Sequence, residues 1–202
     1  MAATRFWIKL ASLACVSIST VSVAQQKQSD ADMQLALGTA NGIVEAVIGN
    51  GDLKPARFAQ VVAVPTKAAE DMKNAVGLVS NAVDSARSKA DLPYHDSLDA
   101  ELVEQQCVMG MIAIKPSFST LRKLAADNPN NAQGVVSADA DEMGEFKLKG
   151  MVAQPYTIFA TGKVGMNVAL WFVDIPIAGQ SDRVKLTRPQ ITCYDPKGRY
   201  KP

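Results

Sequence analysis

The residues of this chain that could carry chemistry are few and lie far apart in the sequence. His95 is the only histidine, and it stands beside Asp96 in a polar stretch. A single histidine cannot supply the three protein ligands typical of a catalytic zinc site. It also cannot form a Cys-His couple with a cysteine that is disulfide-bonded. We therefore expect His95 to be a solvated loop residue.

Four acidic residues gather around one glycine. Asp139, Asp141, Glu142 and Glu145 surround Gly144, and carboxylate oxygens at close spacing are ligands that calcium prefers. The stretch lacks the regular ligand loop of a calcium site, however, and aspartate and glycine are also residues that form turns. We expect a turn at this position and no metal site.

No set of a nucleophile, a base and an orienting group can be assembled from the remaining residues. The sequence therefore predicts a protein that is not an enzyme and that has no cofactor. Trp171 and Phe172 could form an aromatic platform for a sugar, but they lie in an apolar run, which favours a core position. Tyr194, Arg199 and Tyr200 stand in the tail, where no pattern fixes their arrangement.

The first 24 residues have the pattern of a secretory signal peptide. Arg5 and Lys9 precede an apolar stretch over residues 10–23, and Ser-Val-Ala at 22–24 is a small-x-small cleavage site. The apolar stretch is shorter than the ~20 residues that cross a bilayer. A lipid-modified Cys15 stays open as an alternative to cleavage after Ala24. We expect a periplasmic or secreted protein.

Removal of the signal peptide leaves a polar leader at residues 25–32, which we expect to be disordered, and a single domain over residues 33–202. The formal net charge of the whole chain is +1, which argues against nucleic acid as a partner. Cys107 and Cys193 remain, and an exported protein lies in an oxidising compartment. We predict that they form a disulfide; the alternative is two buried free thiols.

The elements that must position these residues begin with two strands. Residues 40–48 and 58–64 are rich in β-branched and small apolar residues, and Gly-Asn-Gly-Asp at 49–52 is a strong turn signal between them.

A helical block follows the second strand. Apolar residues at spacings of three and four predict a helix over residues 67–87, and Ser97 can cap a second one after a break at 91–96. The second helix continues through Cys107 towards Ile112, although residues 108–114 could equally be a buried strand. Pro116 is expected to end it, and a short third helix is expected over residues 117–126.

The C-terminal part reads as strands again. A strand near Val135 and one over residues 145–149 are expected to form a hairpin around the acidic turn. Alternation over residues 156–161 predicts another strand. The apolar run at residues 168–175 predicts a central strand that is covered on two faces.

Strands that flank a helical block predict an α+β protein, namely an antiparallel β-sandwich that carries two or three inserted helices over residues 66–133. The segment Asp141-x-x-Gly144-x-Phe146-x-Leu148, followed by Tyr156 and Ala160, resembles the carboxypeptidase regulatory-like (prealbumin-like, transthyretin-like) domains. Gly42-x-Val44, the Gly51 turn and residues 55–61 are similar to the first two strands of that family. The resemblance implies seven strands and a non-enzymatic module.

This chain departs from the family at Gln154-Pro155, where a glycine normally precedes the tyrosine by two residues, and by its helical insertion. The sequence therefore predicts an exported, non-enzymatic protein of the cell envelope that acts as a structural or protein-interaction module. In this hypothesis the insertion presents Met109, Met111 and Ile112 to a protein partner. The alternative is a module that binds a small ligand, such as a glycan, between the sandwich and the helices.

Overall fold

The computed structural model describes residues 38–47, 51–90, 97–127, 134–176 and 183–201. The predicted signal peptide, the leader and Cys15 lie outside the described residues, as do the break at 91–96 with His95 and turn residues 49–50. The predictions for these segments therefore stay predictions.

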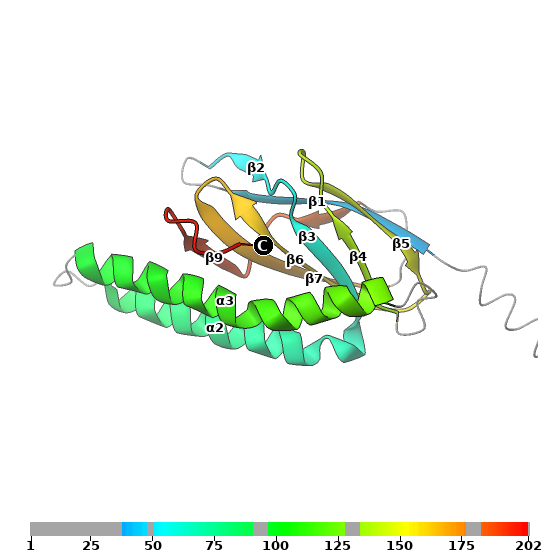
Figure 1. The fold of residues 1–202 in the computed structure, drawn as a ribbon, viewed down its shortest axis with the longest axis horizontal. Coiled ribbons are helices and arrows are strands. Elements are labelled where there is room, and N and C mark those ends of the chain that lie inside the picture. The colour runs from blue at the N-terminus through cyan, green and yellow to red at the C-terminus, as the bar shows by residue number, and fades with distance from the viewer. Residues whose placement is uncertain (1–37, 48–50, 91–96, 128–133, 177–182, 202) are drawn as a thin grey trace, which may run out of the picture. The chain divides into compact units, whose positions relative to one another are not determined.

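Nine strands and two long helices make up the described part of the chain (Figure 1). The elements in order are β1 (Gly38–Val47), β2 (Leu53–Pro55), β3 (Gln60–Pro65), a 3-10 turn (Thr66–Ala68), α2 (Glu70–Ala90), α3 (Ser97–Asp127), β4 (Val136–Asp139), β5 (Glu145–Met151), β6 (Tyr156–Val164), β7 (Asn167–Ile175), β8 (Val184–Leu186) and β9 (Ile191–Tyr194).

The strands form two sheets. In the small sheet, β1 pairs with β2 and β5 in antiparallel fashion and with β8 in parallel. The large sheet has the order β4-β3-β6-β7-β9 and is antiparallel throughout. The architecture is therefore α+β, as predicted, with two sheets of four and five strands in place of the expected seven strands. The parallel β1–β8 pair departs from the expected antiparallel sandwich. Two of the nine strands, β2 and β8, are only three residues long.

The large sheet is covered on both faces. Between the two sheets lies one apolar core, which includes Val44, Leu148, Ile158 and Trp171. A second core lies on the other face of the large sheet and joins Val62, Phe159 and Leu170 to residues of α2 and α3. Figure 1 shows the two helices side by side along this face. The helical insertion therefore packs on a sheet face instead of projecting from the sandwich.

The burial of the strands follows their side-chain period. In β5, Phe146 and Leu148 are buried whereas Glu145 and Lys147 are exposed, as the alternation predicted. Strands β6 and β7 are buried on both faces because they lie between the two cores. Trp171 is fully buried, and its indole N–H donates to the carbonyl of Glu45 in the small sheet at 2.9 Å. Its predicted core position is confirmed.

The predicted hairpin around the acidic turn is wrong. Strand β4 pairs with β3 in the large sheet, whereas β5 pairs with β1 in the small sheet. The turn itself forms, and one carboxylate oxygen of Asp141 accepts the backbone N–H groups of Met143 (2.8 Å) and Glu145 (2.9 Å). The same turn residues thus carry the chain from one sheet to the other. Local sequence signals do not distinguish such a connection from the turn of a hairpin.

The predicted end of the second helix at Pro116 is also wrong. Helix α3 includes this proline and continues to Asp127, so the expected third helix is its last part. A proline inside a helix costs about 3 kcal/mol. Ile114 and Phe118, which flank it, are buried against the large sheet, and this packing offsets the cost. The helical interpretation of residues 108–114 is confirmed.

The turn between the sheets yields a test at Gly144. Its φ is +76°, and an added Cβ would lie 2.5 Å from the carbonyl oxygen of Val44. We expect Gly144→Ala to lower the free energy of unfolding by roughly 2–4 kcal/mol, because backbone strain and a clash add together. Gly165 also has a positive φ (+61°) but open space around it. Gly165→Ala should therefore cost only about 1–2 kcal/mol in urea denaturation, and equal losses would contradict this account.

Candidate functional site

A cavity of about 370 Å³ lies between α3 and the segment that follows β9. One wall is a single face of the helix, because residues at spacings of three and four share a face. The other wall is the chain from Tyr194 to Arg199. The lining residues are Ala100, Glu101, Glu104, Gln105 and Val108 on the helix and Tyr194, Asp195, Pro196, Lys197 and Arg199 on the tail.

A disulfide joins α3 to β9 next to the residues that line the two walls. Cys107 of α3 and Cys193 of β9 are bonded, with their Cα atoms 5.5 Å apart, and both are fully buried. Cys107 adjoins Val108 in the helical wall, and Cys193 adjoins Tyr194 in the other. The covalent link therefore fixes the distance between the walls.

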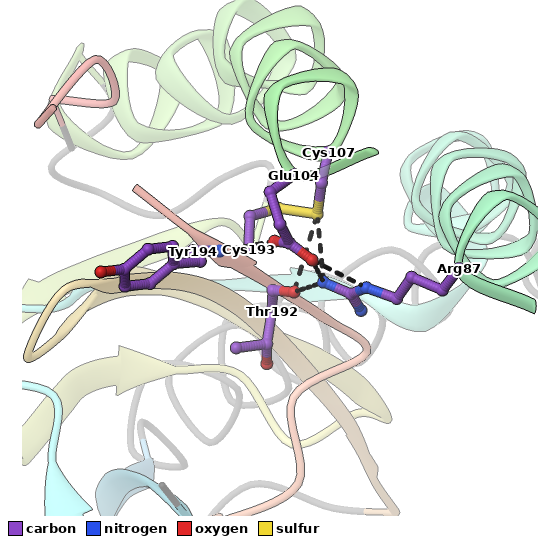
Figure 2. A network of polar contacts seen from close by, with 6 residues as sticks. All are labelled: Arg87, Glu104, Cys107, Thr192, Cys193 and Tyr194. Carbon is purple, nitrogen blue, oxygen red and sulfur yellow. Dashed lines mark hydrogen bonds and ion pairs between the residues drawn. A yellow bond between two sulfur atoms is a disulfide. The ribbon is translucent and has the colours of Figure 1, made fainter. Parts of the chain in front are cut away.

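A polar network beside the disulfide adds a second link (Figure 2). Arg87 reaches from α2 and donates to one carboxylate oxygen of Glu104, with N–O distances of 2.8 and 3.0 Å, and to the carbonyl of Thr192. The other oxygen of Glu104 accepts the backbone N–H of Tyr194 at 2.7 Å. Glu104 thus connects α2, α3 and β9, and its charge is compensated inside the protein.

The tail that forms the second wall is held by Asp195. Its two carboxylate oxygens accept the backbone N–H groups of Arg199 and Tyr200, each at 2.9 Å. Burial raises the pKa of Asp195, but these two hydrogen bonds and the nearby charges of Lys163 and Arg199 together outweigh it, so that the pKa lies below its usual value. Tyr200 is buried, and its hydroxyl lies 2.7 Å from that of Thr161. The tail is therefore held in a defined conformation by these hydrogen bonds.

An exposed ion pair spans the mouth of the cavity. The ammonium of Lys197 lies 3.3 Å from a carboxylate oxygen of Glu101, which also accepts a hydrogen bond from Gln105. The bond from Lys197 is the main reason why the pKa of Glu101 is lowered. Arg199 makes no ion pair with any residue that the structure describes. The lining thus combines donors and acceptors with three apolar residues, of which Val108 is buried whereas Ala100 and Pro196 are exposed.

The acidic residues that the sequence singled out do not lie at this cavity. Asp139 forms an ion pair with Arg122 at 3.0 Å, Glu145 pairs with Arg183, and Asp141 accepts two backbone hydrogen bonds. Asp139, Asp141 and Glu145 line a separate open hollow of about 620 Å³ beside β1 and β5. In the described ranges, no group of three His, Cys, Asp or Glu residues is placed to hold a metal ion.

Of the three residues that the insertion was expected to present, only Met109 is exposed. Met109 is 58% exposed, but Met111 is buried and Ile112 is partly buried against the core. Neither long helix in the described part of the chain is apolar enough to cross a membrane.

Tyr194 and Arg199 stood out in the sequence, but nothing in the sequence indicated the cavity that they line. The helical face reads as an ordinary polar surface in the sequence, and the tail carries no periodic pattern. The two cysteines were the available signal, since a disulfide between them must bring residues near 104 and 194 together.

The pKa of Asp195 gives a pH-dependent test. Because its folded pKa is below the unfolded value of about 3.9, the stabilisation is present above that pH and is lost as the pH falls through the folded pKa. We expect Asp195→Asn to lower the free energy of unfolding by about 2 kcal/mol at pH 7. Urea denaturation should show this difference shrinking towards pH 2.5.

Asp84→Asn serves as the control, because Asp84 is exposed on α2 and should show little difference at either pH. A loss for Asp195→Asn that is the same at both pH values would contradict the role of the carboxylate.

Neither a family model nor a curated protein matches this chain, so the resemblance to carboxypeptidase regulatory-like domains stays a prediction. Among solved structures, the chain is similar to a candidate carbohydrate-binding protein from Pseudomonas aeruginosa, with 14% identity over 81% of this chain and 96% of that one and a TM-score of 0.37. It is also similar to the pilus backbone protein RrgB from Streptococcus pneumoniae, with 15% identity over 75% of this chain and 40% of that one and a TM-score of 0.31.

Proposed function

We propose that this chain is a non-enzymatic binding module that holds a small polar molecule in the cavity between α3 and the tail. The observation that carries the proposal is the double link between the cavity walls, by the Cys107–Cys193 disulfide and by Glu104. Walls held in place before binding lose little freedom when a ligand enters, and this favours affinity. The volume of about 370 Å³ lies in the range of small-molecule sites.

The lining indicates the kind of ligand. Val108 and Pro196 provide apolar contact, and Tyr194 is 46% exposed at the edge. Gln105 and Arg199 at the rim can donate hydrogen bonds, and the carboxylate of Glu101 can accept them. A molecule with an apolar face and several hydroxyl groups, such as a sugar ring, matches both features.

We propose a non-enzymatic module because the carboxylates of the cavity are already engaged in hydrogen bonds and ion pairs. Glu104 is bound to Arg87 and Tyr194, and Asp195 is bound to two backbone N–H groups. Glu101, the third carboxylate of the lining, is paired with Lys197, and both cysteines are in the disulfide. In this proposal none of the three carboxylates acts as a base. An exported location suits such a module, because an oxidising compartment maintains a disulfide.

A cavity-filling substitution tests the binding site. We expect saturation-transfer NMR with glucose, galactose and N-acetylglucosamine as probes to detect binding of at least one sugar, and Ala100→Trp to abolish it. Ala100 is an exposed lining residue, so the larger side chain should block the cavity without disturbing the core.

Ala113→Trp is the matched control, because Ala113 is exposed on the same helix but does not line the cavity. It should bind the same sugar as the unmodified chain. No binding of any of the three probes, or binding that survives Ala100→Trp, would contradict the proposal.

A second candidate function is a structural or protein-interaction module of the cell envelope. It is favoured by three large apolar side chains that are exposed on the helices, namely Leu78 (73%), Leu102 (52%) and Met109 (58%). If they contact a partner, their joint replacement by serine should remove a cross-linked product in the envelope fraction of cells. Leu124→Ser on α3 is the control and should leave the product unchanged. An unchanged product in the triple variant would exclude this surface.

A further inference from the structure

Phe58 is unfavourably placed in two respects. It is the third residue of the turn Ala56–Ala59, in which the N–H of Ala59 donates to the carbonyl of Ala56 at 3.2 Å. Its φ is +54°, and its side chain is 60% exposed. Glycine or asparagine would suit this backbone better, and a polar side chain would suit this exposure.

The surrounding structure maintains this conformation. Ala56 and Ala59 on either side are fully buried, and the N–H of Phe58 donates to the carbonyl of Asp141 at 3.2 Å. A bulky residue that is kept in the left-handed region and exposed points to a role for its ring at the surface.

The ring belongs to a group of exposed apolar side chains at one margin of the sandwich, which we call the apolar tip. Its members are Val47, Leu53, Phe58 and Met143, which are 54% to 65% exposed. Val47 and Leu53 lie opposite each other on β1 and β2, and the turn that holds Met143 is bonded to Phe58 through Asp141. Figure 1 shows β2, the connection from β2 to β3 and the turn between β4 and β5 at the same margin.

The rim of the apolar tip carries both signs of charge. Lys54, Arg57 and Glu142 are exposed, and none of them forms an ion pair within the described ranges of the chain. A rim with both signs can be complementary to itself, because a two-fold axis that passes between the two charges places the cation of one copy opposite the carboxylate of the other. A carboxylate at the rim does not favour an anionic membrane surface. Lys54 and Pro55 lie on the short edge strand β2, where they oppose pairing with a strand of a second copy. Two copies would therefore contact each other through side chains.

We propose that the apolar tip is a self-association surface, through which two copies of this chain pack Phe58, Leu53 and Met143 against each other. Arg57 of each copy faces Glu142 of the other. The tip is small, so the contact belongs to the class of weak, reversible interfaces that bury less than about 1,200 Å². This surface is separate from the cavity at α3, and neither proposal depends on the other.

Phe58→Gly separates self-association from folding. Sedimentation velocity over a concentration series should show a monomer–dimer equilibrium for the unmodified chain, and the variant should raise the dissociation constant at least about tenfold. The melting temperature of the variant should not fall, because glycine adopts this φ without strain. Met166→Ser is the control, since Met166 is equally exposed (60%) in the turn between β6 and β7, and it should leave the equilibrium unchanged.

A charge exchange tests the partner directly. Arg57→Glu and Glu142→Arg should each weaken self-association, because each places like charges across the two-fold axis. An equimolar mixture of the two variants should restore the dimer, since both cross-interface pairs are then attractive. A chain that stays monomeric at the highest concentration, a mixture that does not recover, or a monomer that instead binds phosphatidylcholine vesicles through Phe58 would overturn the proposal.

Discussion

The need to cover both faces of the large sheet determines most of this structure. Strands β3, β6 and β7 present apolar side chains in both directions, towards the small sheet and towards the helices. A buried Val, Leu or Phe side chain contributes roughly 1.5–3 kcal/mol relative to an exposed one. Val62, Phe159 and Leu170 would lie on an open surface without α2 and α3. The insertion between β3 and β4 is therefore first a structural layer, and only its remaining surface is available for binding.

This requirement explains which parts of the fold could be predicted from the sequence. The near-continuous apolar run in β7 indicated a strand with two buried faces, and the period of α2 indicated one buried helix face. Both are local consequences of covering the sheet. The pairing of β4 with β3 and of β5 with β1 is not local, because the acidic turn between them has the same residues whether it closes a hairpin or crosses between sheets. The predicted helix end at Pro116 was wrong for a related reason. Tertiary packing of the residues on both sides of the proline outweighs its tendency to break a helix.

The candidate site was less predictable because it arises from distant parts of the chain. Its helical wall is polar in the sequence, and its second wall is the tail after β9. Two interactions bring them together: the Cys107–Cys193 disulfide and the carboxylate of Glu104, which binds Arg87 of α2 and the backbone of Tyr194. The disulfide could be proposed from compartment and cysteine number. The position of Glu104 required the structure, since nothing near it in the sequence indicates that it contacts β9.

The disulfide has two effects, one on the stability of the whole fold and one on the geometry of the cavity. The core between the two sheets contains neither cysteine, and it is closed by β1, β5, β6 and β7. The link instead lies in the core between the large sheet and the helices. The chain-entropy model assigns a link across 86 residues about 4–5 kcal/mol. In the native structure, the same link fixes α3 to β9 and so holds the two cavity walls. The first effect acts on the unfolded chain and therefore stabilises the whole fold. The second effect is local, because it sets the distance between α3 and β9, which the proposed binding site needs.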